Sequence, residues 1–97
     1  MVEKVLVDTL QFARTYGFKG AVVISFCPMC NSRDNIVAFL TYYPTDKDLC
    51  KKMDWYVLLF PICKFCMDKY EVNEIRNTIY KNIETLLKSG TKIDVRT

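Results

Sequence analysis

Two short segments of the chain carry pairs of cysteines at a spacing that supports metal binding or redox chemistry. Cys27 and Cys30 lie in the segment FCPMCN, and Cys63 and Cys66 lie in the segment ICKFCM. Four thiolates from two such pairs complete a tetrahedral zinc site, whereas a single pair with a lowered thiol pKa can exchange disulfides. The pairs therefore indicate one shared metal site, two separate redox pairs or disulfides, or buried free thiols.

The choice among these depends on the elements that position the two pairs. Apolar runs rich in β-branched residues predict strands, and apolar residues at helical spacing predict helices. We expect strands over residues 21–26, 35–43 and 55–61, helices over 2–16, 45–53 and 68–89, and either an edge strand or an irregular end in the closing segment KIDVRT.

The order of these strands predicts that the two pairs meet. The first strand ends just before Cys27, the second runs back from the first pair, and the third returns and ends just before Cys63. In a simple antiparallel meander, the first and third strands finish at the same end of the sheet. We therefore predict an α+β fold, in which a three-stranded antiparallel meander packs with an N-terminal helix and a long C-terminal helix around a four-cysteine metal site.

The residues around the pairs resemble those of a treble-clef zinc finger, with the four-cysteine zinc ribbon as the near alternative. The first pair has the knuckle form Cys-Pro-x-Cys and is followed by Asn31, a residue that tolerates a positive φ. The second pair runs directly into the predicted long helix. This resemblance covers residues 21–79 and implies one structural Zn²⁺, bound by Cys27, Cys30, Cys63 and Cys66, in a protein that binds nucleic acid or another protein. The same thiolates would also suit iron.

A redox function is the second alternative. The segment VVISFCPMC looks like the strand and Cys-Pro-x-Cys of glutaredoxin-like proteins, which have a helix directly after the pair to lower the pKa of the nucleophilic thiol. Here the strand-like segment NIVAFLTYY follows, which favours the metal site over a thiol–disulfide oxidoreductase. The chain has no histidine, and four cysteine ligands leave no open position, so we expect no catalytic zinc and no enzyme. The remaining cysteine, Cys50, suits a small buried apolar position.

Length, hydropathy and charge limit the class of protein. A chain of 97 residues with a hydrophobic fraction of 51% predicts one folded domain over residues 1–97. Its longest apolar run, residues 55–63, is too short for a membrane helix, and the acidic start does not suit a signal peptide, so we expect a cytoplasmic protein. Four thiolates and one Zn²⁺ would lower the formal net charge from +3 to +1, which is little for nucleic-acid binding.

The predicted long helix has a polar face on the side away from its isoleucines. Its residues are of types that contact phosphates and bases: Lys69, Asn73, Arg76, Asn77 and Tyr80. Glutamates on the same helix dilute this charge. We therefore expect a non-catalytic structural-zinc module for protein interaction or regulation, with a protein partner or a homodimer, and a nucleic-acid-binding zinc finger as the alternative.

Overall fold

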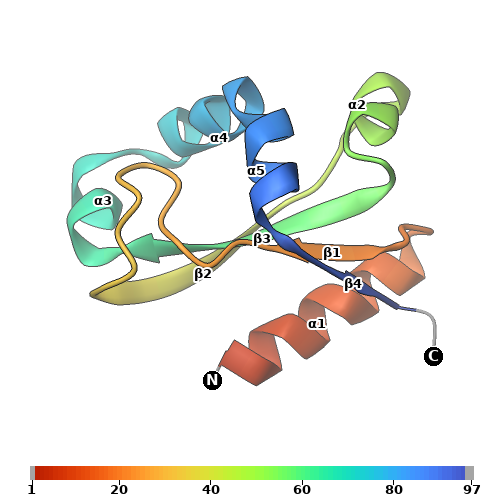
Figure 1. Ribbon diagram of the computed structural model, residues 1–97, viewed down its shortest axis with the longest axis horizontal. Helices are drawn as coiled ribbons and strands as arrows, with labels where there is room; N and C mark the ends of the chain where they lie inside the picture. The colour runs from red at the N-terminus through yellow and green to blue at the C-terminus, as the bar shows by residue number, and fades with distance from the viewer. Residues whose placement is uncertain (1, 96–97) are drawn as a thin grey trace.

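A four-stranded mixed sheet with helices on both faces organises the chain in the computed structural model, which describes residues 2–95. In chain order the elements are α1 (Val2–Thr15), β1 (Gly20–Val23), β2 (Ile36–Tyr42), α2 (Lys47–Lys52), β3 (Tyr56–Cys63), α3 (Lys64–Lys69), α4 (Val72–Lys81), α5 (Ile83–Ser89) and β4 (Thr91–Asp94). Figure 1 shows α1 on one side of the sheet and α2 to α5 on the other. The predicted α+β class is confirmed.

The predicted three-stranded antiparallel meander is wrong. The strand order is β2-β3-β1-β4, so β3 lies between the first two strands of the chain. It pairs parallel with β1 and antiparallel with β2, and β4 pairs antiparallel with the other edge of β1. Every residue of β3 is buried, and a central position is the one that covers such a strand on both faces and both edges. The order of the strands along the chain does not show which of them takes the central position.

Pro61 lies in this central strand, where proline is normally excluded because it lacks an N–H group. The N–H of Ile24 donates to the carbonyl of Leu59 at 2.8 Å, so the polar groups of Leu59 face β1. By the alternation along a strand, the nitrogen of Pro61 points to the same side. The β1 ladder ends at the pair Val23 and Leu59, so the missing N–H of Pro61 costs the sheet no hydrogen bond.

The predicted long helix over residues 68–89 is also wrong, because three shorter helices occupy residues 64–89. Tyr70 is extended, with φ −111° and ψ 144°, and separates α3 from α4. Asn82 separates α4 from α5, and its side-chain amide donates to the carbonyl of Thr78 at 3.0 Å. Such local side-chain bonds compete with a regular helix. The two breaks allow α3 to follow the end of β3 while α4 and α5 turn across the sheet (Figure 1).

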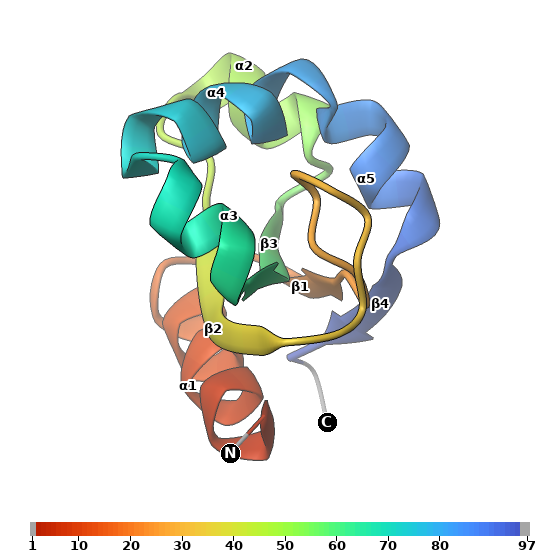
Figure 2. The same ribbon diagram turned by 90° about the vertical axis from the view of Figure 1, so that its left-hand side faces the viewer.

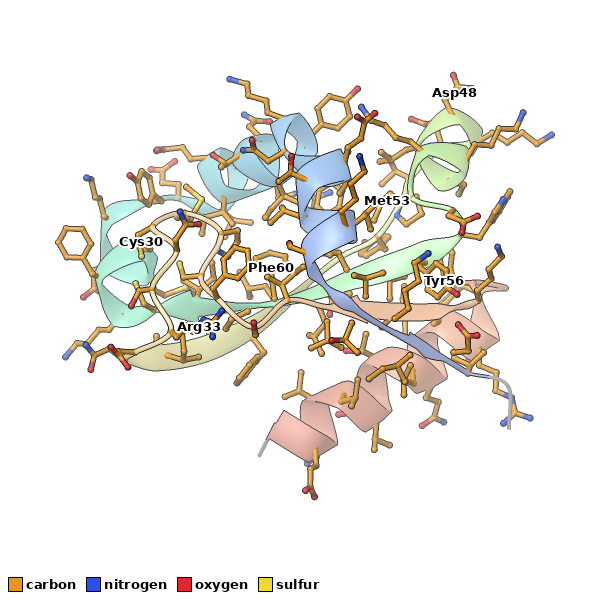
Figure 3. The ribbon with its side chains drawn as sticks, viewed as in Figure 1. Cys30, Arg33, Asp48, Met53, Tyr56 and Phe60 are labelled. Carbon is orange, nitrogen blue, oxygen red and sulfur yellow. The ribbon has the colours of Figure 1, made fainter. Side chains whose placement is uncertain are left out.

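The sheet separates two apolar clusters. The larger cluster lies between the sheet and helices α2 to α5, where Phe60 and Met53 are labelled in Figure 3. It contains Ile75, Ile79 and other members of the apolar stripe that the helical spacing predicted. Val72, three residues before Ile75 and therefore at the same helical spacing, is instead 60% exposed. The smaller cluster holds α1 against the opposite face through Ala13, Ala21 and Val57, which makes α1 a core element.

The closing segment forms an edge strand. Strand β4 covers Thr91–Asp94 and pairs with β1. Of the two alternatives expected for KIDVRT, the edge strand is therefore the one observed, over residues 92–94, and residues 96–97 lie outside the described chain. Gly90 lies directly before β4, where a Cβ would overlap with Cγ1 of Val22. A side chain at this position would push β4 away from the sheet.

Candidate metal centre

The first cysteine pair lies in a tight loop between β1 and β2. The N–H of Asn31 donates to the carbonyl of Cys27 at 2.6 Å, and the N–H of Cys27 donates to the carbonyl of Ser32 at 2.7 Å. Asn31 has φ 64°, so the positive φ predicted for it from the knuckle pattern is confirmed. This turn folds the chain back on itself and brings Cys30 toward the side chain of Cys27.

The second pair spans the junction of a strand and a helix. Cys63 is the last residue of β3 and the N-cap of α3, and its Sγ accepts a 3.4 Å hydrogen bond from the N–H of Cys66. Cys66 follows in the first turn of α3 and is 1% exposed. A helix adjoins the second pair, as predicted, but it begins at Lys64, inside the pair and four residues before the predicted start, and it ends at Lys69. The described residues after the first pair run without a helix into β2, unlike the glutaredoxin-like pattern.

All four sulfur atoms converge at one end of the sheet, the end that faces the viewer in Figure 2. The Sγ atoms of Cys27, Cys30, Cys63 and Cys66 lie within 4.8 Å of one another, and those of Cys30 and Cys63 are 3.6 Å apart. A tetrahedral Zn²⁺ with Zn–S bonds of about 2.3 Å separates its ligands by about 3.8 Å. The cysteine cluster, meaning these four residues, therefore has the dimensions of a metal site.

The predicted meeting of the pairs is confirmed, although the strand pairing that was expected to cause it is not. β1 and β3 are parallel neighbours, so their C-terminal ends lie side by side without a meander. The direction of each strand along the chain was predicted correctly, and direction alone determines the end at which each pair emerges. The neighbour of each strand does not affect this result.

The cysteine cluster is covered by the core on one side and is accessible to solvent on the side of Cys30. Cys27, Cys63 and Cys66 are buried, and Cys30 is exposed in the loop beside α3 (Figure 3). Phe26 and Met29 pack against the apolar cluster next to these sulfurs. A surface groove runs past the open side and is lined by Cys30, Ser32, Asp34, Asn35, Cys63, Lys64, Phe65 and Asp68.

The two thiols of the second pair have different acidities. The hydrogen bond from the N–H of Cys66 lowers the pKa of Cys63 to about 7, with further hydrogen bonds from neighbouring thiols. Burial raises the pKa of Cys66, and its contacts with the other thiols add to this shift. Cys63 is thus the member of the pair that more readily becomes a thiolate. A thiolate is the form that binds a metal.

Cys50 lies apart from the cysteine cluster. It is on α2, at the other end of β3 from α3 (Figure 1), and it is 9% exposed. The prediction of a small buried apolar residue is confirmed for this position.

The predicted binding surface is divided between two helices. Lys69 is on α3, whereas Asn73, Arg76, Asn77 and Tyr80 are on α4, so the expectation that they share one helix is wrong. All five are exposed. The guanidinium of Arg76 lies 5.8 Å from the centre of the Tyr42 ring, and Nζ of Lys69 lies 5.3 Å from that of Tyr70. These basic groups are therefore in contact with aromatic rings of the same chain.

One neighbour of this surface is not evident from the sequence. Nζ of Lys52, on α2, lies 5.3 Å from the centre of the Tyr80 ring on α4. No spacing along the chain relates residues 52 and 80, because their proximity depends on how α2 and α4 cross the same face of the sheet.

No helix among residues 2–95 combines the length and the hydropathy that crossing a membrane requires. Comparison of the chain with protein-family models, with curated proteins and with solved structures found no match.

Proposed function

We propose that the cysteine cluster binds one Zn²⁺ as a structural ion, and that the chain is a non-catalytic module for protein interaction or regulation. The convergence of four sulfur atoms within 4.8 Å of one another is the observation that carries this proposal. Two Cys-x-x-Cys pairs around one point are the usual ligand set of structural zinc sites. Iron in the same four thiolates is the main competing ion.

A structural role follows from the ligand set. Four thiolates fill a tetrahedral shell and leave no position for water or substrate. The ion would join the loop after β1, the end of β3 and the first turn of α3, and so would connect two distant parts of the chain. Because metal binding at such a site is coupled to folding, the ion would stabilise this end of the sheet.

The protein-interaction role is supported by the surface beside the cluster. Phe65, in the first turn of α3, is 67% exposed, and Met67 is 39% exposed. Phe65 lines the groove described above, which passes Cys30 and Cys63 on the open side of the cluster. Phenylalanine and methionine are enriched in protein interfaces, so their exposure beside a groove supports this role.

Metal analysis of the purified protein tests the proposal. Elemental analysis should give one Zn²⁺ per chain, and a Co²⁺-substituted sample should show the absorption of tetrahedral thiolate coordination. Cys50→Ser is the matched control, because it removes a thiol outside the cluster and should leave the stoichiometry unchanged. A folded protein with no metal and with five free thiols would refute the site. An iron content of one per chain would keep the site and change its ion.

A second candidate function is nucleic-acid binding through α2 and α4. The observation that favours it is the contact of Lys52 with Tyr80 at 5.3 Å. Tyr80 is 52% exposed, so its ring can still stack on a base, and Lys51, Lys52 and Arg76 supply positive charge on the same two helices. Aromatic rings beside basic groups are the usual contacts to single-stranded nucleic acids.

A further inference from the structure

Strand β2 forms an edge of the sheet that is free to pair with another strand. We propose that the chain forms a homodimer in which the β2 strands of two copies pair antiparallel, about a two-fold axis at Leu40. This inference rests on the proposed role in protein interaction and names the partner as a second copy. It does not depend on the metal site.

The backbone groups of β2 that face outward can be identified from the register. Leu59 directs its polar groups toward β1, as its hydrogen bond with Ile24 shows, and Leu59 is opposite Thr41. The N–H and C=O of Thr41 therefore point away from β3, and by alternation so do those of Phe39. Among residues 2–95, no strand pairs with this side of β2. Two donors and two acceptors are thus available at the edge.

The two edges of the sheet differ in how they are protected. Strand β4, at the opposite edge, has only four residues and carries Lys92 and Asp94. Strand β2 has seven residues, IVAFLTY, and none is charged. Charges and short length are the usual means of preventing an edge strand from pairing. The bulge between Ile36 and Ala38 limits the regular part of β2, but this part still contains both Phe39 and Thr41.

The exposed apolar side chains along this edge are self-complementary. Val37 is 55% exposed and Tyr43 is 41% exposed, and each is three residues from Leu40. An antiparallel pairing centred at Leu40 places Phe39 opposite Thr41 of the second copy. It also brings Val37, at the bulge, near Tyr43 of the second copy, which directly follows β2. The contact between Val37 and Tyr43 would occur twice in one dimer, once on each side of the two-fold axis.

A groove between α1 and the same edge would also be covered. Its volume is about 280 Å³, and it is lined by Val5, Asp8, Thr9, Phe12, Thr41 and Tyr43. A two-fold axis perpendicular to the sheet keeps both α1 helices on one face of the joined sheet. The grooves of the two copies would then adjoin across the axis. This closed two-fold arrangement uses the same surface in both copies, as most homodimers do.

The mass of the purified 97-residue chain in solution tests this proposal. Sedimentation equilibrium of the wild type should give twice the chain mass of 11.4 kDa. Val37→Lys adds a charge at the paired edge and should shift the protein to monomer. Val72→Lys is the matched control, because Val72 is 60% exposed on α4 and the same substitution there should leave the dimer unchanged.

A second variant tests the backbone bonds. Thr41→Pro removes an outward-facing N–H and no bond to β3, so it should also yield monomer while retaining the native circular dichroism spectrum. Hydrogen exchange of the wild-type protein tests the same bonds without a substitution. The Phe39 and Thr41 amides should exchange more slowly as the protein concentration rises, because their N–H groups would be hydrogen-bonded in the dimer.

Three results would overturn the proposal. The first is a wild-type mass that stays at 11.4 kDa up to about 1 mM, a concentration at which even weak interfaces are populated. The second is a dimer that both Val37→Lys and Thr41→Pro leave intact. The third is an exchange rate of the Phe39 and Thr41 amides that does not change with protein concentration. The zinc content of each sample separates this outcome from the proposed function. A monomer with one Zn²⁺ per chain refutes the dimer alone, whereas a dimer without metal refutes the zinc site alone.

Discussion

The hydroxyl of Tyr56 donates a 2.5 Å hydrogen bond to the carboxylate of Asp94 across Gly20, the β1 residue that pairs with both of them. This bond links the first residue of β3 to the last residue of β4 over the strand between them. Gly20 leaves room for the approach, since a Cβ on it would overlap with the carbonyl oxygen of Ile93. The bond to Asp94, followed by burial, raises the pKa of Tyr56.

Removing this hydroxyl should weaken the β4 edge. We expect Tyr56→Phe to lower the free energy of unfolding by about 1 kcal/mol at pH 7, the usual net contribution of one hydrogen bond. Urea denaturation of both proteins measures the difference. An unchanged midpoint would show that Asp94 gains as much from water as from Tyr56.

The same pair predicts how the stability difference depends on pH. The pKa of Tyr56 is higher in the folded protein than the ordinary value of 10.0, so the folded state binds this proton more tightly than the unfolded state does. The stabilisation is therefore fully present below about pH 10 and is lost as the pH rises through the raised value. The stability difference between wild type and Tyr56→Phe should shrink above about pH 10, and a difference that stays constant up to about pH 11 would contradict the assigned bond.

Cysteine substitutions should separate the metal ligands from Cys50. Cys63→Ser keeps a side-chain acceptor at the N-cap of α3 but removes a thiolate from the proposed site, so it should lower the unfolding free energy by several kcal/mol. Cys50→Ser should cost only about 1–3 kcal/mol, the usual cost of placing a hydroxyl at a buried site, and it should leave the protein as sensitive to a chelator as the wild type, because all four proposed ligands remain. Thermal unfolding with and without a strong chelator measures both. Equal losses of unfolding free energy in the two variants would contradict the assignment. So would a loss in Cys63→Ser when the chelator does not destabilise the wild type by a similar amount.

The turn after the first pair should be sensitive to the backbone conformation at Asn31. Its φ of 64° is one that alanine adopts at a cost of about 1–2 kcal/mol. We therefore expect Asn31→Ala to destabilise the fold and to weaken Zn²⁺ binding, and Asn31→Gly to be close to neutral. Asn73→Ala, at an exposed position of α4, is the matched control and should not destabilise. Zinc competition with a chromophoric chelator measures the affinity, and equal affinities for Asn31→Ala and wild type would mean that the turn does not position Cys30.

A salt titration tests the second candidate function. If α2 and α4 bind nucleic acid, the double variant Lys52→Ala, Arg76→Ala should reduce the slope of log affinity against log salt by about two, one unit for each phosphate contact. The double variant Lys4→Ala, Arg14→Ala removes the same charge from α1, on the other face of the sheet, and should leave the slope unchanged. Binding of single-stranded RNA weaker than about 10⁻⁴ M at physiological salt would exclude this function.

The sequence by itself determined the local features that depend on neighbouring residues. The Cys-x-x-Cys pairs, the positive φ of Asn31, the start of a helix at the second pair and the apolar spacing of Ile75 and Ile79 are all properties of short segments, and they were predicted from residue types. The direction in which each strand runs was predicted too, because the loop after the first strand and the short helix after the second were each expected to reverse the chain. Together these were sufficient to predict that the four cysteines meet.

Only the tertiary structure decided which segments are neighbours. β3 lies between β1 and β2 because its sequence, YVLLFPIC, has no charged residue and no polar face, and such a strand is stable only when others cover it. The breaks at Tyr70 and Asn82 follow from the need to place α3 at the sheet end and α4 over the core, which outweighs the weak preference of residues 68–89 for one helix. The contact of Lys52 with Tyr80 and the open edge of β2 arise in the same way. Such relationships join residues that are far apart in the chain, and they are set by the burial of apolar surface across the whole sheet rather than by any local pattern.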